Sequence, residues 1–98
     1  MTDRQIYIDK IKDASPYIRK EFDVKSMHLF GSVARNEAME DSDVDLFVEM
    51  PPKALKLVAL KNFLQELLGK AVDIVRSHPN IDPFLRQEIK KDGIAIIQ

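Results

Sequence analysis

The sequence predicts one α/β (α+β) domain over residues 1–98, in which a small mixed sheet of about four strands is flanked by helices. Three observations support this fold class. Apolar residues at helical spacing alternate along the chain with short apolar runs that are typical of strands, and one of these runs alternates strictly between apolar and polar residues. The length of 98 residues, with 45% hydrophobic and 32% charged residues, suits a single compact core.

The first helix is expected to begin near Asp3, because Thr2 and Gln5 form a capping-box pattern just before an apolar repeat. The repeat consists of Ile8, Ile11, Ala14 and Ile18. Ser15-Pro16 lies inside this segment, and a proline ring disrupts a helix interior. We therefore expect a kink or break at Pro16.

Two further segments have the spacing and the end signals of helices. One ends at Gly69, a residue suited to a C-cap, and carries Leu57, Leu60, Leu64, Leu67 and Leu68. The other begins at Asp82-Pro83, where the aspartate suits an N-cap and the proline a first helical position, and it ends at Gly93.

Four segments are expected to form strands, at residues 24–30, 43–50, 71–76 and 94–97. The second is the most informative, because successive side chains of a strand point to opposite faces. The face expected to join the core carries Val44, Leu46, Val48 and Met50. The opposite face carries Asp43, Asp45, Phe47 and Glu49.

Composition excludes several classes of site. The sequence contains no cysteine, so a disulfide scaffold, a thiolate metal site and a cysteine nucleophile are all excluded. The formal net charge of -1 gives no general attraction to nucleic acid or to anionic membranes, so direct nucleic-acid binding is not expected. No apolar stretch approaches the roughly eighteen residues of a membrane span, and residues 1–5 lack a signal-peptide pattern. We expect a cytoplasmic protein without membrane contact.

Two carboxylates lie two residues apart on the alternating strand. Asp43 and Asp45 therefore project from one face, within reach of one hard cation. Without a cation their repulsion is expected to raise the pKa of one carboxyl. Asp73, an acid in an otherwise apolar strand, would supply a third ligand if its strand lies alongside. Carboxylates with waters and substrate phosphates are the ligands that Mg²⁺ prefers, and one or two such ions, or Mn²⁺, would suit phosphoryl or nucleotidyl transfer.

A glycine-serine turn precedes these acids. Gly31-Ser32 follows the apolar residues of the first strand and precedes a short segment, 33–38, that is expected to be helical. Glycine allows the backbone to approach a phosphate, and the serine hydroxyl and helix amides can donate hydrogen bonds to it. Arg35, one turn into that helix, would neutralise a triphosphate or a leaving pyrophosphate.

The order Gly31-Ser32, ten intervening residues, then Asp43-Val44-Asp45 resembles the signature of the DNA polymerase beta nucleotidyltransferase superfamily. The wider motif, with Ala34 and Arg35 after the turn and Ser42 before the aspartates, is similar to its minimal nucleotidyltransferase (MNT) branch, which includes the MntA-like antitoxins of HEPN/MNT toxin-antitoxin pairs. The resemblance extends over most of the chain and implies the nucleotidyltransferase fold.

The resemblance implies a role for each matching residue. Gly31 and Ser32 would bind the triphosphate, with Arg35 and Ser42 also assigned to nucleotide binding, while two Mg²⁺ ions would be held by Asp43, Asp45 and Asp73. Asn36 departs from the family pattern, which usually has glycine after the arginine. Asparagine tolerates a left-handed backbone, so the turn is expected to survive.

Each of these residues also has a simpler interpretation. Asp43 and Asp45 would suit a solvated acidic turn, and Asp73 an edge strand whose charge discourages aggregation. Arg35 would be an ordinary charge on an exposed helix. The leucine-rich segment 55–68 is explained most simply as core, although an apolar excess on its outer face would suit a partner or a homo-oligomer.

By resemblance, the expected function is transfer of a nucleotide, AMP from ATP, to a hydroxyl on a tyrosine of a partner HEPN toxin, so that the protein acts as an antitoxin. Two alternatives remain open. One is an antitoxin with little or no catalysis that neutralises its partner by binding. The other is a transferase acting on a small molecule or on RNA. Base preference, acceptor, number of nucleotides transferred and oligomeric state are not determined by the sequence.

Overall fold

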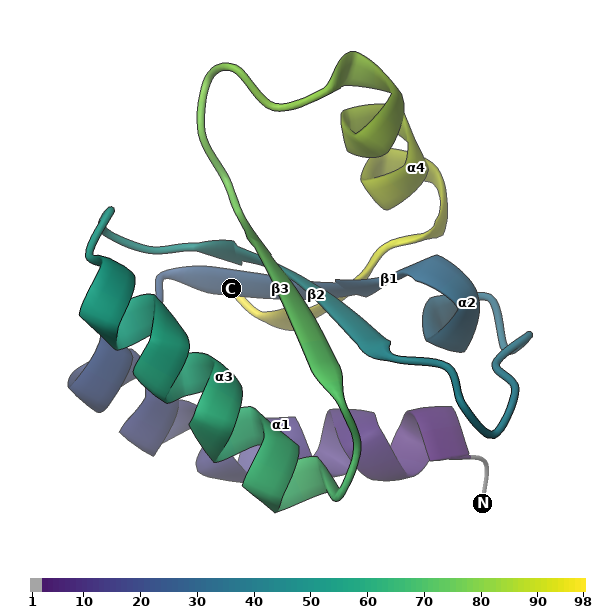
Figure 1. Cartoon of the computed structure of the whole chain (residues 1–98), viewed down its shortest axis with the longest axis horizontal. Helices are drawn as coiled ribbons and strands as arrows, with labels where there is room; N and C mark the ends of the chain where they lie inside the picture. The colour runs from purple at the N-terminus through teal and green to yellow at the C-terminus, as the bar shows by residue number, and fades with distance from the viewer. Residues whose placement is uncertain (1–2) are drawn as a thin grey trace.

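The computed structural model describes residues 3–98, in which helices and strands alternate (Figure 1). In chain order the elements are α1 (Asp3–Phe22), β1 (Ser26–Phe30), α2 (Gly31–Ala34), β2 (Val44–Glu49), α3 (Ala54–Leu68), β3 (Val72–Arg76), α4 (Pro83–Asp92) and β4 (Ile94–Ile97). The strands form one mixed sheet, so the predicted fold class is confirmed.

The strands are ordered β3-β2-β1-β4 across the sheet. β1 is antiparallel to both β2 and β4, whereas β2 and β3 are parallel. A parallel pair needs a long crossover connection, and α3 supplies it. Because of these directions, the C-terminal end of β1 and the N-terminal ends of β2 and β3 meet at the same edge of the sheet. Gly31, Asp45 and Asp73 all lie at this edge.

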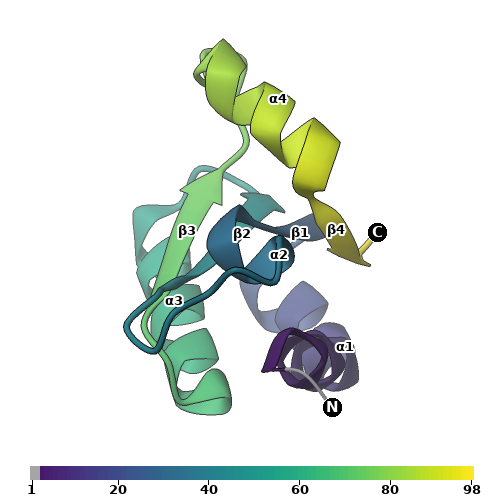
Figure 2. The ribbon, with the colours of Figure 1, turned by 90° about the vertical axis from the view of Figure 1, so that its right-hand side faces the viewer.

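Helices lie on both sides of the sheet. α1 and α3 pack against each other and cover one face, while α4 lies over the other face, where it contacts β1 and α2 (Figures 1 and 2). The largest fully buried side chains of the core are Ile11, Ile18, Met27, Leu29, Leu46, Leu60, Leu64, Ile97, Val44 and Val48. Within residues 3–98, no helix combines the length and hydropathy that crossing a membrane requires.

Several local predictions are confirmed. In β2 the predicted apolar face is buried and the opposite face is exposed or partly exposed. Gly69 ends α3 in the left-handed conformation, with φ of 65°. Asp82 caps α4 by accepting a hydrogen bond of 2.9 Å from the amide of Phe84, and Pro83 is the first helical residue. Capping chemistry thus determines where these helices end or begin.

Of the kink or break predicted at Pro16, the break is wrong. α1 runs without interruption from Asp3 to Phe22 with Pro16 inside it, and its proposed cap Thr2 lies outside the described residues. Pro16 is exposed, as is Lys12, so the Lys12 carbonyl that loses its helical partner can accept from water. Ile11 and Ile18, both fully buried, hold the helix in the core on either side of the proline. Tertiary packing overrides the local cost of the ring.

Two other boundaries differ from the prediction. The short helix expected over 33–38 spans Gly31–Ala34 instead, because Asn36 adopts a left-handed conformation with φ of 60° and ends it. The first strand begins at Ser26, two residues later than the apolar pattern indicated. Val24 is buried although it precedes the strand, so burial does not by itself mark a strand boundary.

Replacing Pro16 with alanine is expected to stabilise the protein by about 2 kcal/mol. A proline inside a helix costs about 3 kcal/mol relative to alanine, and part of this is offset because proline also restricts the unfolded chain. Urea titration of Pro16→Ala measures the change. Ser15→Ala on the same helix is the matched control, with an expected gain of no more than about 0.5 kcal/mol. A Pro16→Ala variant no more stable than this control would contradict the packing argument.

Candidate active site

The candidate site lies where β1 ends and β2 and β3 begin. In the sheet Phe30 pairs with Asp45, and Asp45 pairs with Asp73. Paired residues on neighbouring strands point to the same face, and the strands are about 4.8 Å apart. The parallel register therefore brings Asp73 alongside Asp45, as the sequence analysis required for a third ligand.

Asp45 is the most enclosed of the three aspartates. Its neighbours Val44 and Leu46 are fully buried and anchor the strand in the core, while Asp45 itself is partly buried on the opposite face. Desolvation by burial raises the pKa of the Asp45 carboxyl above its ordinary value, and the charges of Asp73 and Asp43 raise this pKa further. The raised pKa expected within the carboxylate group is thus found at Asp45.

Asp43 and Asp73 complete the acidic group. Both are exposed, and Asp43 lies one residue before β2 begins. Within the described part of the chain, no three carboxylate or imidazole groups stand close enough to form a ready-made metal cluster. The donor set nevertheless fits a hard divalent cation, because the ionised form of Asp45 is disfavoured by the two neighbouring charges and a cation would relieve that repulsion.

Gly31 makes a close approach to this group. It has φ of 76°, and a Cβ atom added there would lie 2.2 Å from Oδ2 of Asp45. Any side chain at this position would therefore clash with the carboxylate, and the left-handed backbone would itself be strained in a non-glycine residue. Ser32 follows directly, partly buried, at the second position of α2. Gly31 is thus required by the position of Asp45.

The turn after α2 is a Schellman motif. The amide of Glu37 donates to the carbonyl of Ser32 at 2.8 Å, and the amide of Asn36 donates to the carbonyl of Val33 at 3.0 Å. Asn36 is the left-handed residue of this motif. Asparagine therefore performs the conformational role of the family's glycine, and this departure leaves the turn intact.

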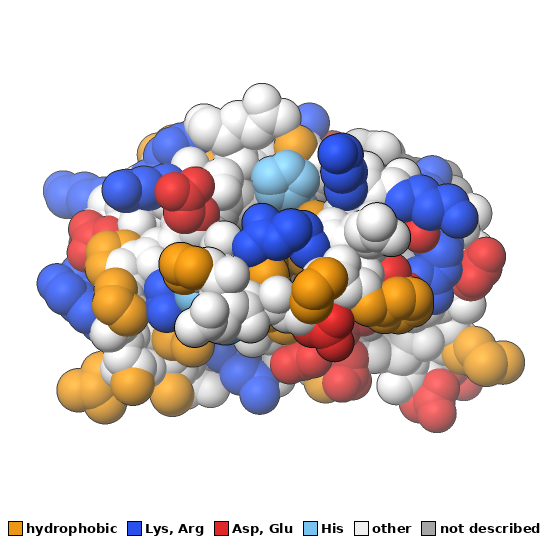
Figure 3. Space-filling model, turned by 90° about the horizontal axis from the view of Figure 1, so that it is seen from above, with side chains coloured by type: hydrophobic (Ala, Val, Ile, Leu, Met, Phe, Trp, Pro, Cys, Tyr) orange, Lys and Arg blue, Asp and Glu red, His pale blue; other side chains and the backbone are white. Residues whose placement is uncertain are grey.

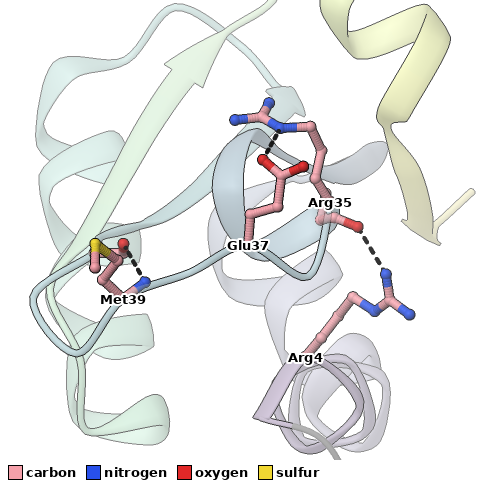
Figure 4. A network of polar contacts seen from close by, with 6 residues as sticks. Arg4, Arg35, Glu37 and Met39 are labelled. Carbon is pink, nitrogen blue, oxygen red and sulfur yellow. Dashed lines mark hydrogen bonds and ion pairs between the residues drawn. The ribbon is translucent and has the colours of Figure 1, made fainter.

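Arg35 was predicted to lie inside a helix, and this prediction is wrong. It is the C-cap of α2, and its Nε atom forms a 3.2 Å ion pair with Oε2 of Glu37 (Figure 4). The positive charge of Arg35 acts against the rise in the pKa of Asp45. Arg35 is therefore electrostatically part of the site while its guanidinium is paired with Glu37.

Ser42 belongs to the turn before β2 and lines a cavity. Its hydroxyl accepts a 2.9 Å hydrogen bond from the amide of Met39, and it lines a cavity of about 300 Å³ with Arg4, Tyr7 and Asn36. This cavity lies between the first turn of α1 and the loop that precedes β2, and none of the three aspartates lines it. The structure thus shows Ser42 closing the turn that leads to Asp43.

Two polar contacts of this region were missed by the sequence analysis. They are the Arg35–Glu37 pair and a 2.8 Å hydrogen bond from Nη1 of Arg4 to the carbonyl of Ala34 (Figure 4). Local spacing gave no signal for the second contact, because its partners are 30 residues apart.

Seen from the α4 side, acidic and basic side chains are interspersed and form no single basic patch (Figure 3).

Replacing Gly31 with alanine is expected to lower the free energy of unfolding by about 2 kcal/mol, from backbone strain and the clash with Asp45. Gly69→Ala is the matched control, because Gly69 has a similar φ of 65° but no atom within 4 Å of an added Cβ. Urea titration of both variants separates strain from clash. In an Asp45→Gly background, which removes the whole Asp45 side chain, the two glycine substitutions should cost the same, and a persistent difference would contradict the clash.

Replacing Asp45 with asparagine is expected to raise the melting temperature of the metal-free protein at neutral pH. A carboxyl whose pKa is raised in the folded state weakens that state once it ionises, so the gain should shrink as pH falls through the pKa of Asp45. Thermal melts across pH measure this, and added Mg²⁺ should stabilise wild type more than the variant. Asp41→Asn, at an exposed loop acid, is the control. A wild type as stable as Asp45→Asn in neutral metal-free buffer would refute the electrostatic argument.

Comparison with known proteins identifies a family model and relatives in sequence that match most of the chain. A family model described as a nucleotidyltransferase domain matches residues 11–96. A candidate protein adenylyltransferase of Methanocaldococcus jannaschii is 37% identical over 95 residues, which cover 91% of this chain and 97% of that protein. Protein adenylyltransferase MntA of Thermococcus cleftensis is 45% identical over 60 residues, which cover 59% of this chain and 61% of that protein.

Solved structures share the fold. A candidate minimal nucleotidyltransferase matches with a TM-score of 0.75 and 34% identity, over 96% of this chain and 95% of that one. The structure of a tri-AMPylated HEPN toxin of Shewanella oneidensis in complex with an MNT antitoxin gives a TM-score of 0.66 at 20% identity, over 95% and 71% of the two chains. The latter shows likeness of fold alone. The family model, the sequence relatives and the first of these structures agree with the motif: the chain belongs to the nucleotidyltransferase family and is an enzyme of its minimal branch.

Proposed function

We propose that the protein transfers AMP from ATP to the hydroxyl of a tyrosine on a HEPN toxin partner and thereby acts as an antitoxin. The observation that carries this proposal is the register that sets Asp73 beside Asp45, with Gly31 against the Asp45 carboxylate. Relatives named protein adenylyltransferases support ATP as the donor and a protein as the acceptor. The AMPylated HEPN toxin held by an MNT antitoxin of the same fold supports the choice of partner.

The turn at the end of β1 is proposed to bind the triphosphate. Gly31 has no side chain to keep a phosphate away, and the first amides of a helix have no intrahelical acceptor. The hydroxyl of Ser32 is a further donor. Ser42 is proposed to support this site by closing the turn that leads to Asp43, through its hydrogen bond with the Met39 amide.

Arg35 is proposed to neutralise charge on the pyrophosphate. To do so it must leave Glu37, and the cost of leaving is small. The side chains of this pair are 34% and 66% exposed, and exposed ion pairs contribute about 0 to 1 kcal/mol. A triphosphate carries more negative charge than one carboxylate, so it can displace Glu37.

The three aspartates are proposed to support an in-line displacement. Asp43, Asp45 and Asp73 would hold two Mg²⁺ ions, or Mn²⁺, which neutralise the triphosphate and lower the pKa of the attacking hydroxyl. The hydroxyl oxygen forms a bond to the α-phosphorus, and the bond from that phosphorus to the bridging oxygen of pyrophosphate breaks. Asp73, which is exposed, is proposed to accept the hydroxyl proton.

Incubation with ATP and Mg²⁺, together with the protein encoded beside this chain, is expected to add one or more AMP units to that partner, as measured by intact mass. Asp43→Asn, Asp45→Asn and Asp73→Asn should each slow the transfer roughly a hundredfold or more, because each removes a negative ligand. Asp41→Asn, which changes an exposed acid in the preceding loop, should stay within about twofold of wild type.

Other outcomes distinguish the alternatives. Tight binding to the partner with no gain in mass, and with an affinity that Asp43→Asn leaves unchanged, would indicate an antitoxin that acts by binding alone. A gain in mass on a small molecule or an RNA, with none on the protein, would indicate that the acceptor is not a protein. Loss of transfer in Asp41→Asn to the same degree as in Asp43→Asn would contradict the assignment of specific ligands.

A further inference from the structure

The short helix α2 has a long-range contact at its C-terminal end. Four residues, Gly31–Ala34, give α2 four carbonyl groups, and the last carbonyls of a helix have no intrahelical partner. Three of them accept from amides just downstream: those of Gly31, Val33 and Ser32, at 3.1, 3.0 and 2.8 Å. The carbonyl of Ala34 accepts instead from Nη1 of Arg4, at 2.8 Å.

Arg4 reaches this carbonyl from the first turn of α1, 30 residues away (Figure 4). The guanidinium is a permanently charged donor, the bond is partly buried, and hydrogen bonds from charged donors are stronger than neutral ones. Val33 and Ala34 belong to the same hydrophobic core as Tyr7 and Ile8 of α1, and Tyr7 and Val33 line the cavity beside Arg4. Arg4 therefore ties α2 to the layer of helices beneath the sheet.

A single helical turn has little stability of its own, so its position depends on its packing against β1, β2 and α4 and on the contacts at its two ends. At the start of α2, Gly31 fits against Asp45 with no room for a Cβ. At its end, Arg4 holds the Ala34 carbonyl. A tilt of α2 about the Gly31 end would move the Ser32 hydroxyl and the first helical amides relative to Asp45.

We propose that Arg4 is a positioning residue for the nucleotide: by holding the end of α2, it holds the Gly31-Ser32 turn in the orientation that the triphosphate requires. This inference rests on the proposed function of that turn. Arg4 does not touch the reacting atoms. Its loss should therefore weaken nucleotide binding more than it slows the chemical step.

The test compares Arg4→Ala, Arg4→Lys and wild type for the dissociation constant of magnesium ATP and for transfer kinetics. Loss of a hydrogen bond from a charged donor should weaken binding on the order of tenfold, with kcat within about threefold, because a rise in KM at constant kcat marks lost binding. Arg4→Lys keeps a cationic donor and should recover most of the affinity. Hydrogen exchange of the Glu37 amide, which bonds to Ser32, should be faster in Arg4→Ala while amides of β2 are unchanged.

Arg19→Ala is the matched control. Arg19 lies on the same helix and likewise donates to backbone carbonyls, those of Lys25 and Gln98, away from the aspartates. Equal affinity for magnesium ATP in Arg4→Ala and wild type, or equal losses in Arg4→Ala and Arg19→Ala, would overturn the proposal. If wild type binds no magnesium ATP, the proposed function fails, and an unchanged Glu37 exchange rate in Arg4→Ala would separately refute the tether. If Arg4→Ala does not fold, Arg4→Lys is compared with Arg19→Lys by the same measurements.

Discussion

The close approach of Gly31 to the carboxylate of Asp45 is the constraint on which the rest of the site depends. It requires the strand order that brings the end of β1 beside the start of β2, and it requires a residue without a Cβ at a positive φ. It also places the first turn of α2 directly against the acidic group. Backbone amides, a hydroxyl and carboxylates are thereby collected at one edge of the sheet.

This arrangement weakens the folded state in the absence of a cation. Asp45 is held on a strand whose neighbouring residues are fully buried, and it faces the charges of Asp43 and Asp73. Both factors disfavour its ionised form. A divalent ion bound between these carboxylates would relieve their repulsion and so stabilise the folded state. The helices α1 and α3 supply the packing that tolerates this cost.

The sequence was informative where local chemistry decides structure. Strict alternation identified β2, left-handed glycine and the Asp82 cap identified helix ends, and the spacing from Gly31 to Asp45 predicted the candidate site. It failed where packing competes with local preference. Pro16 remains inside α1 because buried isoleucines hold the helix on both sides, and α2 is shorter than predicted because Asn36 turns the chain.

The sequence by itself determined the donor groups, their order along the chain and the faces of the strands to which they belong, because these depend on residue type and on a strand period of two. Only the tertiary structure decided that β2 and β3 are parallel with Asp45 opposite Asp73, and that Arg4 reaches Ala34. The physical reason is distance along the chain. Register and long-range hydrogen bonds are set by how the whole core packs, and no local pattern of residues encodes them.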